Sequence, residues 1–356
     1  MPFFCIFALV MNINILTDEQ LSQLNALIDG AEHIVVCCHK SPDGDAIGAS
    51  LAWWSYLTDI RGKSADIVVP DAFPDFLQWL PNSEKVIRYD RKTEQAAERF
   101  AQADLVFCLD FNSPNRLSEM EPLLTECKAP RVLIDHHMEP DIEACLCISQ
   151  PRLSSTSEMV FRIIWQLGHF EQMTKKMAVP IYCGMMTDTM AFTVNCNDPA
   201  IYFIQSLLLT KQVDREKVHR QVYNNYSQWA IRLRGYILYQ RMQYLSDLHA
   251  AYFIITREDM KRFHFVKGDA EGLVNEPLRI KGTRLSISLR EDDRNDNLVW
   301  VSLRSVGSFN CQQVAEQFFN GGGHFNASGG RLNCSVEEAE QIVRNAIQAF
   351  AEQLKQ

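Results

Sequence analysis

The stretch RVLIDHHMEP, residues 131–140, joins a short apolar run directly to one acid and two histidines. Residues 132–134 have the composition of a buried strand, and Asp135, His136 and His137 follow without a break. The simplest interpretation of such a triplet is a polar strand end that opens into a loop. The triplet indicates chemistry only if other strands of the chain end in acids or histidines as well.

Several other apolar runs have the same character. HIVVCC begins at residue 33, ADIVVP at residue 65 and DLVFCLD at residue 104, and the stretch AIGASLAWWSYLTD at 46–59 reads as a helix between two of them. This alternation of short strands and amphipathic helices predicts a doubly wound parallel α/β sheet over residues 31–151. In such sheets, functional side chains gather at the carboxyl ends of the strands.

Acids and histidines follow these strands repeatedly. The candidates, together with one acid from the later stretch CGMMTDTMAF, are His39, Asp43, Asp45, Asp110, Asp135, His136, His137 and Asp188. Like charges gathered at one sheet edge repel one another unless a cation lies among them. Carboxylate and imidazole without thiolate favour Mn(II) or Mg(II) over structural zinc. Six ligating side chains among these eight candidates exceed what one ion needs, so two ions sharing a carboxylate are expected. Such a pair of ions clamps the attacking and the leaving oxygen in phosphoryl transfer.

Each of these residues also has a structural interpretation when it is taken alone. Asp43 and Asp45 flank Gly44 and fit a turn with capping acids. Asp188 fits a structural acid, and His137 fits a hydrogen-bonded group outside the ligand set. The shared position at strand ends favours the metal interpretation for the group.

The second half of the chain has a different pattern. Residues 152–245 are predicted to be mostly helical, and strands return from Ala251, followed by a last helix with a capping box at Ser335 and Glu338. We therefore expect a catalytic domain over 1–215, a linker helix over 216–248 and a smaller α/β domain over 249–356. The stretch GGGHFNASGG at 321–330 can present backbone N–H groups to a phosphate, although a flexible glycine loop has the same composition.

Composition limits the partners. The formal net charge is -9, and such a chain is poorly suited to long nucleic acids, which are bound mainly through phosphate neutralisation. The 11 cysteines form no CxxC pair, which indicates a reduced, cytoplasmic protein. The apolar start MPFFCIFALVMN is too short to span a membrane and lacks signal-peptide features. We interpret Met11 as a candidate true start.

Five stretches, HKSPDGDAIGAS, LDFNSPNRL, IDHH, GMMTDTMAF and GGGHFNASGG, together resemble the successive signatures of the DHH phosphoesterases and their associated C-terminal domain. The resemblance runs from about Thr17 to the last helix and is strongest to the branch of nano-RNases and pAp phosphatases. It implies a Mn(II)-dependent phosphoesterase, with Mg(II) as the other candidate ion. The implied substrates are di- to pentanucleotides and 3′-phosphoadenosine 5′-phosphate (pAp).

Motif positions in this family imply a role for each candidate residue. One ion would be held by His39, Asp43 and Asp110, and the other by Asp45, Asp110, His136 and Asp188. His137 would lie beside the reacting phosphate, and Asp135 would orient a metal-bound imidazole from outside. Substrate phosphate would meet the second domain, across a cleft, at Arg304, Ser305, Gly322, Gly323 and His324.

Other functions stay open. The same architecture would serve a phosphodiesterase of cyclic di-AMP or of its linear product pApA. A long-substrate exonuclease needs a further domain for which the chain has no room, and the GGGH stretch disfavours a pyrophosphatase. A non-catalytic nucleotide-binding module would have lost a metal ligand, and none is missing. The sequence does not fix the oligomeric state, so a homodimer remains open.

Overall fold

The computed structural model describes residues 13–266 and 268–356. The chain divides into two compact units, the first ending at Asn225 and the second running from Tyr226 to Gln356. Each unit has its own six-stranded sheet. The interpretation of Met11 and of the residues before it lies outside the described residues.

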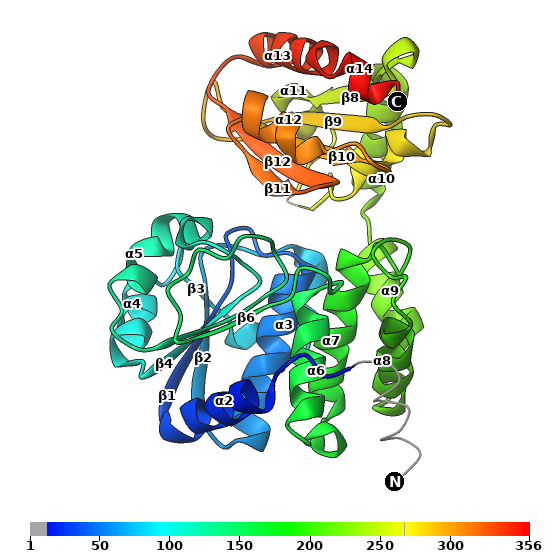
Figure 1. The fold of residues 1–356 in the computed structure, drawn as a ribbon. Helices are drawn as coiled ribbons and strands as arrows, with labels where there is room; N and C mark the ends of the chain where they lie inside the picture. Colours follow the sequence, from blue (N-terminus) through cyan, green and yellow to red (C-terminus); the bar gives the residue numbers. More distant parts are fainter. Residues whose placement is uncertain (1–12, 267) are drawn as a thin grey trace. The chain divides into compact units, whose positions relative to one another are not determined.

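A parallel sheet forms the centre of the first unit (Figure 1). Its strands are β1 (His33–Cys37), β2 (Ser64–Val69), β3 (Ile87–Arg88), β4 (Leu105–Leu109), β5 (Arg131–Asp135) and β6 (Leu146–Ser149). Their order is β3-β2-β1-β4-β5-β6, so the direction of winding reverses between β1 and β4. The carboxyl ends of strands beside such a reversal border a crevice, where ligands of this fold class bind. The predicted doubly wound parallel sheet is confirmed.

Helices cover both faces of this sheet (Figure 1). One face carries α2 (Asp18–Gly30), α3 (Gly44–Ser55), α6 (Thr156–Gln166) and α7 (Lys175–Asp188), and the other carries α4 (Thr93–Gln102) and α5 (Glu121–Thr125). Successive residues of β1 enter different cores, Ile34 and Val36 on the first face and Val35 and Cys37 on the second. A strand buried on both faces has no polar positions, which explains the unbroken apolar runs in the sequence.

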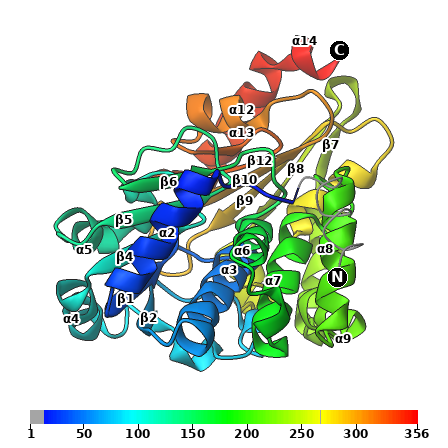
Figure 2. The same ribbon diagram turned by 60° about the horizontal axis from the view of Figure 1, so that its bottom comes forward.

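The helices nearest the strand ends are packed closely. α3, α6 and α7 lie side by side in both ribbon views (Figures 1 and 2) and contact one another. Gly48 on α3 permits this approach, because a Cβ there would lie 2.6 Å from the carbonyl oxygen of Pro180 on α7. The first unit is completed by α8 (Pro199–Thr210) and α9 (Arg215–Tyr223).

The second unit is a smaller mixed sheet with helices, as predicted. It contains α10 (Gln228–Tyr236), β7 (Gln243–Leu245), β8 (Ala250–Ile255), α11 (Arg257–Arg262), β9 (Leu285–Glu291), β10 (Val299–Ser305), α12 (Cys311–Phe318), β11 (Gly322–His324), β12 (Ala327–Leu332), α13 (Val336–Ala349) and α14 (Ala351–Leu354). The strand order is β11-β12-β10-β9-β8-β7. Among the described strands of this second sheet, β8 and β9 pair in parallel and all other neighbours pair antiparallel. The capping box of Ser335 and Glu338 begins α13, as expected.

The predicted linker helix over 216–248 is not a single helix. Asn224 ends α9, and Ser227 starts α10 by accepting the N–H of Ala230 at its hydroxyl. The residues after α10 include a π-helical turn at Ile237–Arg241 and strand β7. The helical spacing of apolar residues therefore continues through a stretch where two capping residues break the hydrogen-bond pattern.

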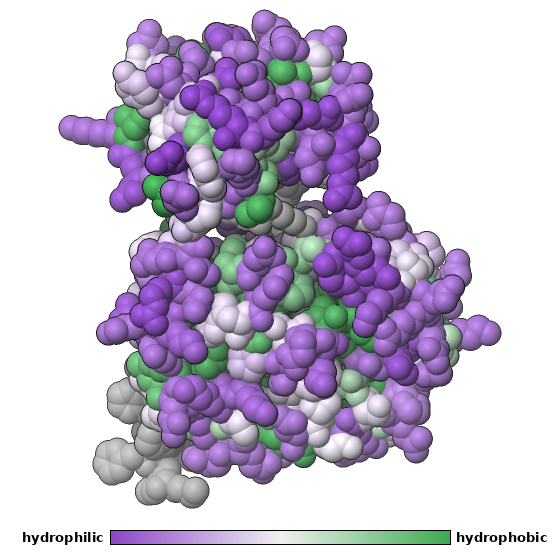
Figure 3. All heavy atoms as spheres, turned by 180° about the vertical axis from the view of Figure 1, so that it is seen from behind, coloured by the Kyte–Doolittle hydropathy of each residue, from purple (hydrophilic) through white to green (hydrophobic). Residues whose placement is uncertain are grey.

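Polar residues cover most of the face that Figure 3 shows of each unit, which agrees with a formal net charge of -9. Among the described residues, no helix has both the length and the apolar composition that crossing a bilayer requires.

Candidate metal centre

Three neighbouring strands of the first unit place acids and histidines at one edge of the sheet. Asp110 directly follows β4, and His39 lies just beyond the end of β1. Asp135 is the last residue of β5, and His136 and His137 come next. Because β1, β4 and β5 are adjacent and parallel, their carboxyl ends lie together.

Helix ends supply the other candidate acids. Asp43 is the N-cap of α3, where its Oδ1 atom accepts the N–H groups of Asp45 and Ala46 at 3.0 Å each. Asp45 lies in the first turn of α3, and Asp188 is the last residue of α7. The capping interpretation of Asp43 is therefore correct for one oxygen, while its Oδ2 atom lies 3.9 Å from Nε2 of His39.

The first cluster of candidate ligands consists of His39, Asp43 and Asp110. Nδ1 of His39 lies 2.8 Å from the carbonyl oxygen of Lys40. A carbonyl oxygen only accepts, so Nδ1 carries the proton and Nε2 is left as a donor of electrons to a metal. Nε2 lies 3.6 Å from Oδ2 of Asp110.

The second cluster consists of Asp45, Asp110 and His136, with Asp188 beside it. Nδ1 of His136 faces the carbonyl oxygen of Leu153 at 3.3 Å, which again directs Nε2 toward the acids. From Nε2 the distances are 3.3 Å to Oδ2 of Asp188 and 3.6 Å to Oδ1 of Asp110. Oδ2 of Asp45 is 4.0 Å away.

These separations fit ligands around an ion better than they fit hydrogen bonds. Nitrogen–oxygen hydrogen bonds in proteins are about 2.9 Å long, whereas the separations here run from 3.3 to 4.0 Å. Ligand atoms about 2.1 Å from one ion and roughly at right angles lie about 3 Å or more apart. Asp110 offers Oδ2 to the first cluster and Oδ1 to the second. The donor set thus fits two divalent ions that share Asp110.

Electrostatics point to the same need for a cation. Burial and the carboxylates of Asp110 and Asp188 raise the pKa of Asp45 well above its usual value. Burial also acts to raise the pKa of Asp110, but His39 and the other two histidines outweigh burial, so this pKa falls below its usual range. The pKa of His136 is raised: burial acts to lower it, and the surrounding acids prevail. Buried carboxylates that compete for the charge of a few imidazoles are stabilised by an added cation.

Asp110 also has an unusual backbone conformation. Its φ angle is +65°, in the left-handed region that side-chain-bearing residues other than Asn and Asp rarely adopt. This conformation occurs directly after β4, where the chain leaves the sheet at the centre of both clusters. Aspartate tolerates this conformation better than most residues, so the residue type suits both the backbone and the candidate ligand role.

Asp135, expected to orient an imidazole of the site from outside, contacts His137. The Oδ1 atom of Asp135 accepts a hydrogen bond from Nδ1 of His137 at 2.7 Å, and Asp135 is fully buried. The imidazole in the metal cluster, His136, uses the carbonyl of Leu153 instead. Strand β5 ends at Asp135 and the chain bends at His137, and the two imidazoles lie against each other with ring centroids 5.0 Å apart.

Sequence reasoning missed the contribution of the N-terminus of α6. The backbone N–H groups of Thr156 and Ser157 donate to the two carboxylate oxygens of Asp45, at 2.6 and 2.8 Å. The hydroxyl of Thr156 donates to Oδ1 of Asp110 at 2.9 Å. By its pattern, the stretch SSTSE at 154–158 indicates only a helix start, yet all of it is buried. Five polar residues next to an apolar helix were the available signal.

In the second unit, Arg304 and His324 belong to the same face of the sheet. Arg304 pairs with Ala327 across β10 and β12, and His324 pairs with Ala327 across β11 and β12. Directly paired residues point to the same side of a sheet. Ser305, the next residue, points to the other side, where it is buried and its hydroxyl donates to the carbonyl of Phe309 at 2.7 Å. The strand period therefore separates Ser305 from the other polar candidates.

The glycine stretch forms an edge strand, β11, rather than an open loop. A Cβ at Gly323 would lie 2.7 Å from the carbonyl oxygen of Ala327, and its φ angle of +140° also favours glycine. At Gly322, by contrast, a Cβ would meet no described atom within 4 Å. The fold thus requires glycine at 323, whereas the space beside 322 is open to a ligand.

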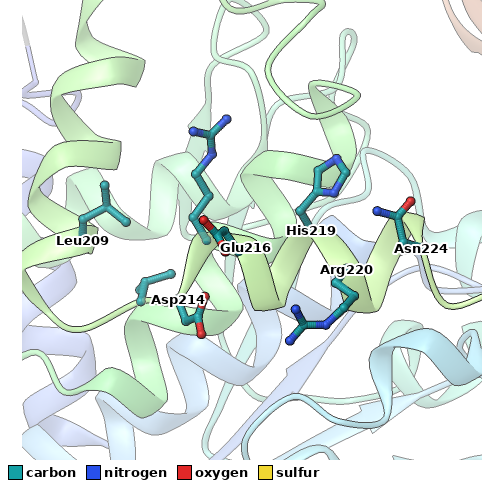
Figure 4. Close-up of a pocket in the computed structure, with 8 residues that line it drawn as sticks. Leu209, Asp214, Glu216, His219, Arg220 and Asn224 are labelled. Atoms are coloured by element: carbon teal, nitrogen blue, oxygen red, sulfur yellow. The ribbon is translucent and has the colours of Figure 1, made fainter.

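An open hollow lies elsewhere on the first unit, beside α8 and α9 (Figure 4). Its volume is about 730 Å³, and acidic and basic side chains such as Asp214, Glu216 and Arg220 alternate along it. None of the predicted ligands lines this hollow. Its mixed charge selects no class of ligand.

Known proteins match both units of the chain. Residues 33–185 match the model of the DHH family, N-terminal domain, and residues 251–355 match the DHHA1 domain. A crystal structure of an exopolyphosphatase-related protein from Bacteroides fragilis superimposes with a TM-score of 0.90 at 43% identity, covering 96% of this chain and 100% of the other.

Two curated relatives differ in length. The bifunctional oligoribonuclease and PAP phosphatase NrnA of Thermus thermophilus is 27% identical over 88% of this chain and 89% of its own length. The cyclic-di-AMP phosphodiesterase PdeA of Listeria monocytogenes is 25% identical over 92% of this chain and 49% of its own length. The chain therefore spans about half the length of PdeA.

Proposed function

Because the chain belongs to the DHH family, we propose that it is a metal-dependent phosphoesterase that hydrolyses short nucleotides by a two-metal mechanism. The proposed substrates are di- to pentanucleotides of RNA and pAp, with Mn(II) as the resident ion. The observation that carries this proposal is the pair of ligand clusters that share Asp110 through different oxygens. The similarity to NrnA supports the substrate class.

Bound ions would lower the pKa of the attacking water and neutralise charge on the reacting phosphate. His39 and His136 hold their Nε2 atoms toward the site through hydrogen bonds of Nδ1 to backbone carbonyls. The carboxylate of Asp135 accepts a hydrogen bond from Nδ1 of His137 at 2.7 Å and so fixes the orientation of a ring that can act as acid or base toward a phosphoryl oxygen or the attacking water. His137 is thus the proposed acid/base or electrostatic group, and Asp135 orients it.

Three of the proposed substrate contacts of the second unit, Arg304, Gly322 and His324, lie on one face of its sheet. Between Arg304 and His324 the paired positions are small, with Ala327 on β12 and Gly322 opposite Gly329. Small residues flanked by a guanidinium and an imidazole provide room and charge for a phosphate group. We propose that Arg304, His324, Gly322 and Gly323 contact the substrate. Ser305 contributes from the other face, by accepting a hydrogen bond from Asn326 at 2.8 Å and so holding the hairpin.

Cyclic di-AMP, or its linear product pApA, is the second candidate substrate. The similarity to PdeA favours it, and both activities cleave a phosphoester of a small adenine nucleotide. The catalytic clusters are the same for either substrate, so the choice rests on the contacts to the remainder of the nucleotide.

A panel of substrates tests the proposal. The purified protein is assayed with Mn(II), with Mg(II) and with a chelator, on pAp, a dinucleotide, cyclic di-AMP, pApA, inorganic polyphosphate and bis-p-nitrophenyl phosphate. We expect Mn(II)-dependent turnover with the highest kcat/KM on pAp or the dinucleotide. Preference for cyclic di-AMP or pApA would replace the first candidate by the second. Absence of turnover on every substrate with either ion would overturn the assignment as an enzyme and leave a nucleotide-binding module.

A further inference from the structure

The N-terminus of α6 donates hydrogen bonds to the carboxylates of both Asp45 and Asp110. The backbone N–H groups of Thr156 and Ser157 donate to the two carboxylate oxygens of Asp45. Asp110 receives a side-chain hydroxyl, that of Thr156, at Oδ1. The Thr156 hydroxyl is therefore the part of this contact that a substitution can remove while the backbone contacts stay.

This hydroxyl contacts one side of the shared carboxylate. Oδ1 of Asp110, which it contacts, is the oxygen that faces Nε2 of His136 at 3.6 Å. The other oxygen, Oδ2, faces Nε2 of His39 at 3.6 Å. A hydrogen bond to Oδ1 fixes the rotation of the carboxylate plane, and it orients the lone pairs of the oxygen directed at the His136 cluster more than those of Oδ2.

Buried interactions hold Thr156 in place. The hydroxyl of Ser155 accepts the N–H of Glu158 at 3.0 Å and so caps the helix. Glu158 is fully buried and accepts Nε of Arg162 at 2.7 Å, while its other oxygen accepts the hydroxyl of Ser154 at 2.6 Å. These buried contacts fix the first turn of α6 and with it the position of the Thr156 hydroxyl.

We propose that Thr156 is a positioning residue that presents Oδ1 of Asp110 to the ion of the His136 cluster, and that it acts on this ion more than on the ion of the His39 cluster. The inference rests on the two-metal site of the proposed function, but it concerns ion binding and not hydrolysis. Outer partners of metal ligands typically change affinity by about 10- to 100-fold when they are removed.

The test is a calorimetric titration with MnCl2 of the wild type, Thr156→Val and Thr156→Ser. Valine preserves the shape and the backbone N–H donated to Asp45, and serine restores the hydroxyl. The matched control is Thr283→Val, because Thr283 is also buried and its hydroxyl has no hydrogen-bond partner among the described residues. Two single-cluster backgrounds, His39→Ala and His136→Ala, identify which ion is affected.

We expect Thr156→Val to weaken one Mn(II) site by about 10- to 100-fold and the other by less than about threefold, with Thr156→Ser and Thr283→Val close to the wild type. The weakening should persist in the His39→Ala background and vanish in the His136→Ala background. Unchanged affinity in Thr156→Val, or equal weakening of both sites, would overturn the inference. If the wild type binds Mn(II) but hydrolyses nothing, the proposed function fails, while the titration still decides the role of Thr156.

Discussion

At the scale of single residues, Asp110 combines two properties that constrain each other. Its carboxylate faces both ligand clusters, and its backbone is in the left-handed region with φ at +65°. A substitution intended to remove the ligand must therefore tolerate this backbone conformation. Asparagine does so readily, whereas alanine adds backbone strain to the loss of the ligand.

Asp110→Asn should remove the shared ligand without unfolding the protein. An amide has one oxygen and no charge, so it cannot bridge two cations as a carboxylate does. We expect fewer than two Mn(II) ions per chain by calorimetry and a fall in kcat/KM of about a hundredfold or more, since a two-metal site supplies several kcal/mol. Two ions bound with wild-type affinity would show that Asp110 is not the shared ligand.

His137→Ala should separate chemistry from metal binding. The imidazole of His137 is bonded to Asp135, and the His136 imidazole belongs to the metal cluster. We expect both ions to remain and kcat to fall by about a hundredfold, the size typical of a lost acid/base group. His219→Ala, a histidine of α9 beside the open hollow, is the control and should keep full activity. Loss of an ion in His137→Ala would make this residue a ligand.

At the scale of elements, the site depends on how closely three helices approach. Gly184 on α7 lies against α6 and α3 so tightly that a Cβ would be 2.0 Å from Oγ of Ser157 and 2.9 Å from Oδ1 of Asp45. The helix α7, which ends at Asp188, thus packs directly against the carboxylate of Asp45. Because Gly184 has no side chain, α7 can pack against α3 and α6 without displacing the carboxylate of Asp45.

Gly184→Ala should therefore destabilise the protein and weaken ion binding together. The added methyl group must displace Ser157 or Asp45, and overpacking of this kind costs about 1–3 kcal/mol. Gly235→Ala is the matched control, because Gly235 lies in α10, is exposed, and a Cβ there would meet no described atom within 4 Å beyond its chain neighbours and the adjacent backbone of its own helix. That control should gain up to about 1 kcal/mol from helix propensity. The measurements are thermal unfolding and MnCl2 titration of both variants. A lower Tm with unchanged ion affinity in Gly184→Ala would contradict the prediction that stability and ion binding fall together.

At the scale of the whole molecule, the chain consists of two units with separate cores. One pair of hydrophobic clusters contains only residues of the first unit, and another pair contains only residues of the second. The metal clusters formed by His39, Asp45 and Asp110 lie in the first unit, and the proposed phosphate contacts Arg304 and His324 lie in the second. The candidate metal ligands and the proposed phosphate contacts thus belong to different units of the chain.

The net charge of the whole chain should make the enzyme prefer short substrates. The formal net charge of -9 repels a long polyanion, and we expect kcat/KM to fall steeply from pAp and a dinucleotide to a 20-mer RNA. Arg304→Ala should weaken hydrolysis of the nucleotides about tenfold or more, as expected for a charge-assisted contact, and leave bis-p-nitrophenyl phosphate unaffected. Arg294→Ala, an exposed arginine before β10, is the control. Equal rates on the 20-mer and the dinucleotide would contradict the preference for short substrates.

The sequence by itself determined the sheet and the candidate ligands. Apolar runs that end in acid or imidazole predict buried parallel strands, and parallel strands bring their carboxyl ends together whatever the rest of the fold does. For this reason the amino-acid sequence alone predicts that His39, Asp110 and His136 lie close to one another. The resemblance of five ordered stretches added the roles, which no spacing rule supplies.

Only the tertiary structure decided which groups hold these ligands in place. Thr156 contacts Asp110 across 46 positions of the chain, and a contact of that separation leaves no local pattern in the sequence. The pairing of Asp135 with His137 depends on the bend of the chain after β5. The opposite faces of Arg304 and Ser305 depend on where an extended strand begins its alternation. A shift of one residue exchanges the two faces of a strand, so the sequence could name these residues but not the direction in which each one points.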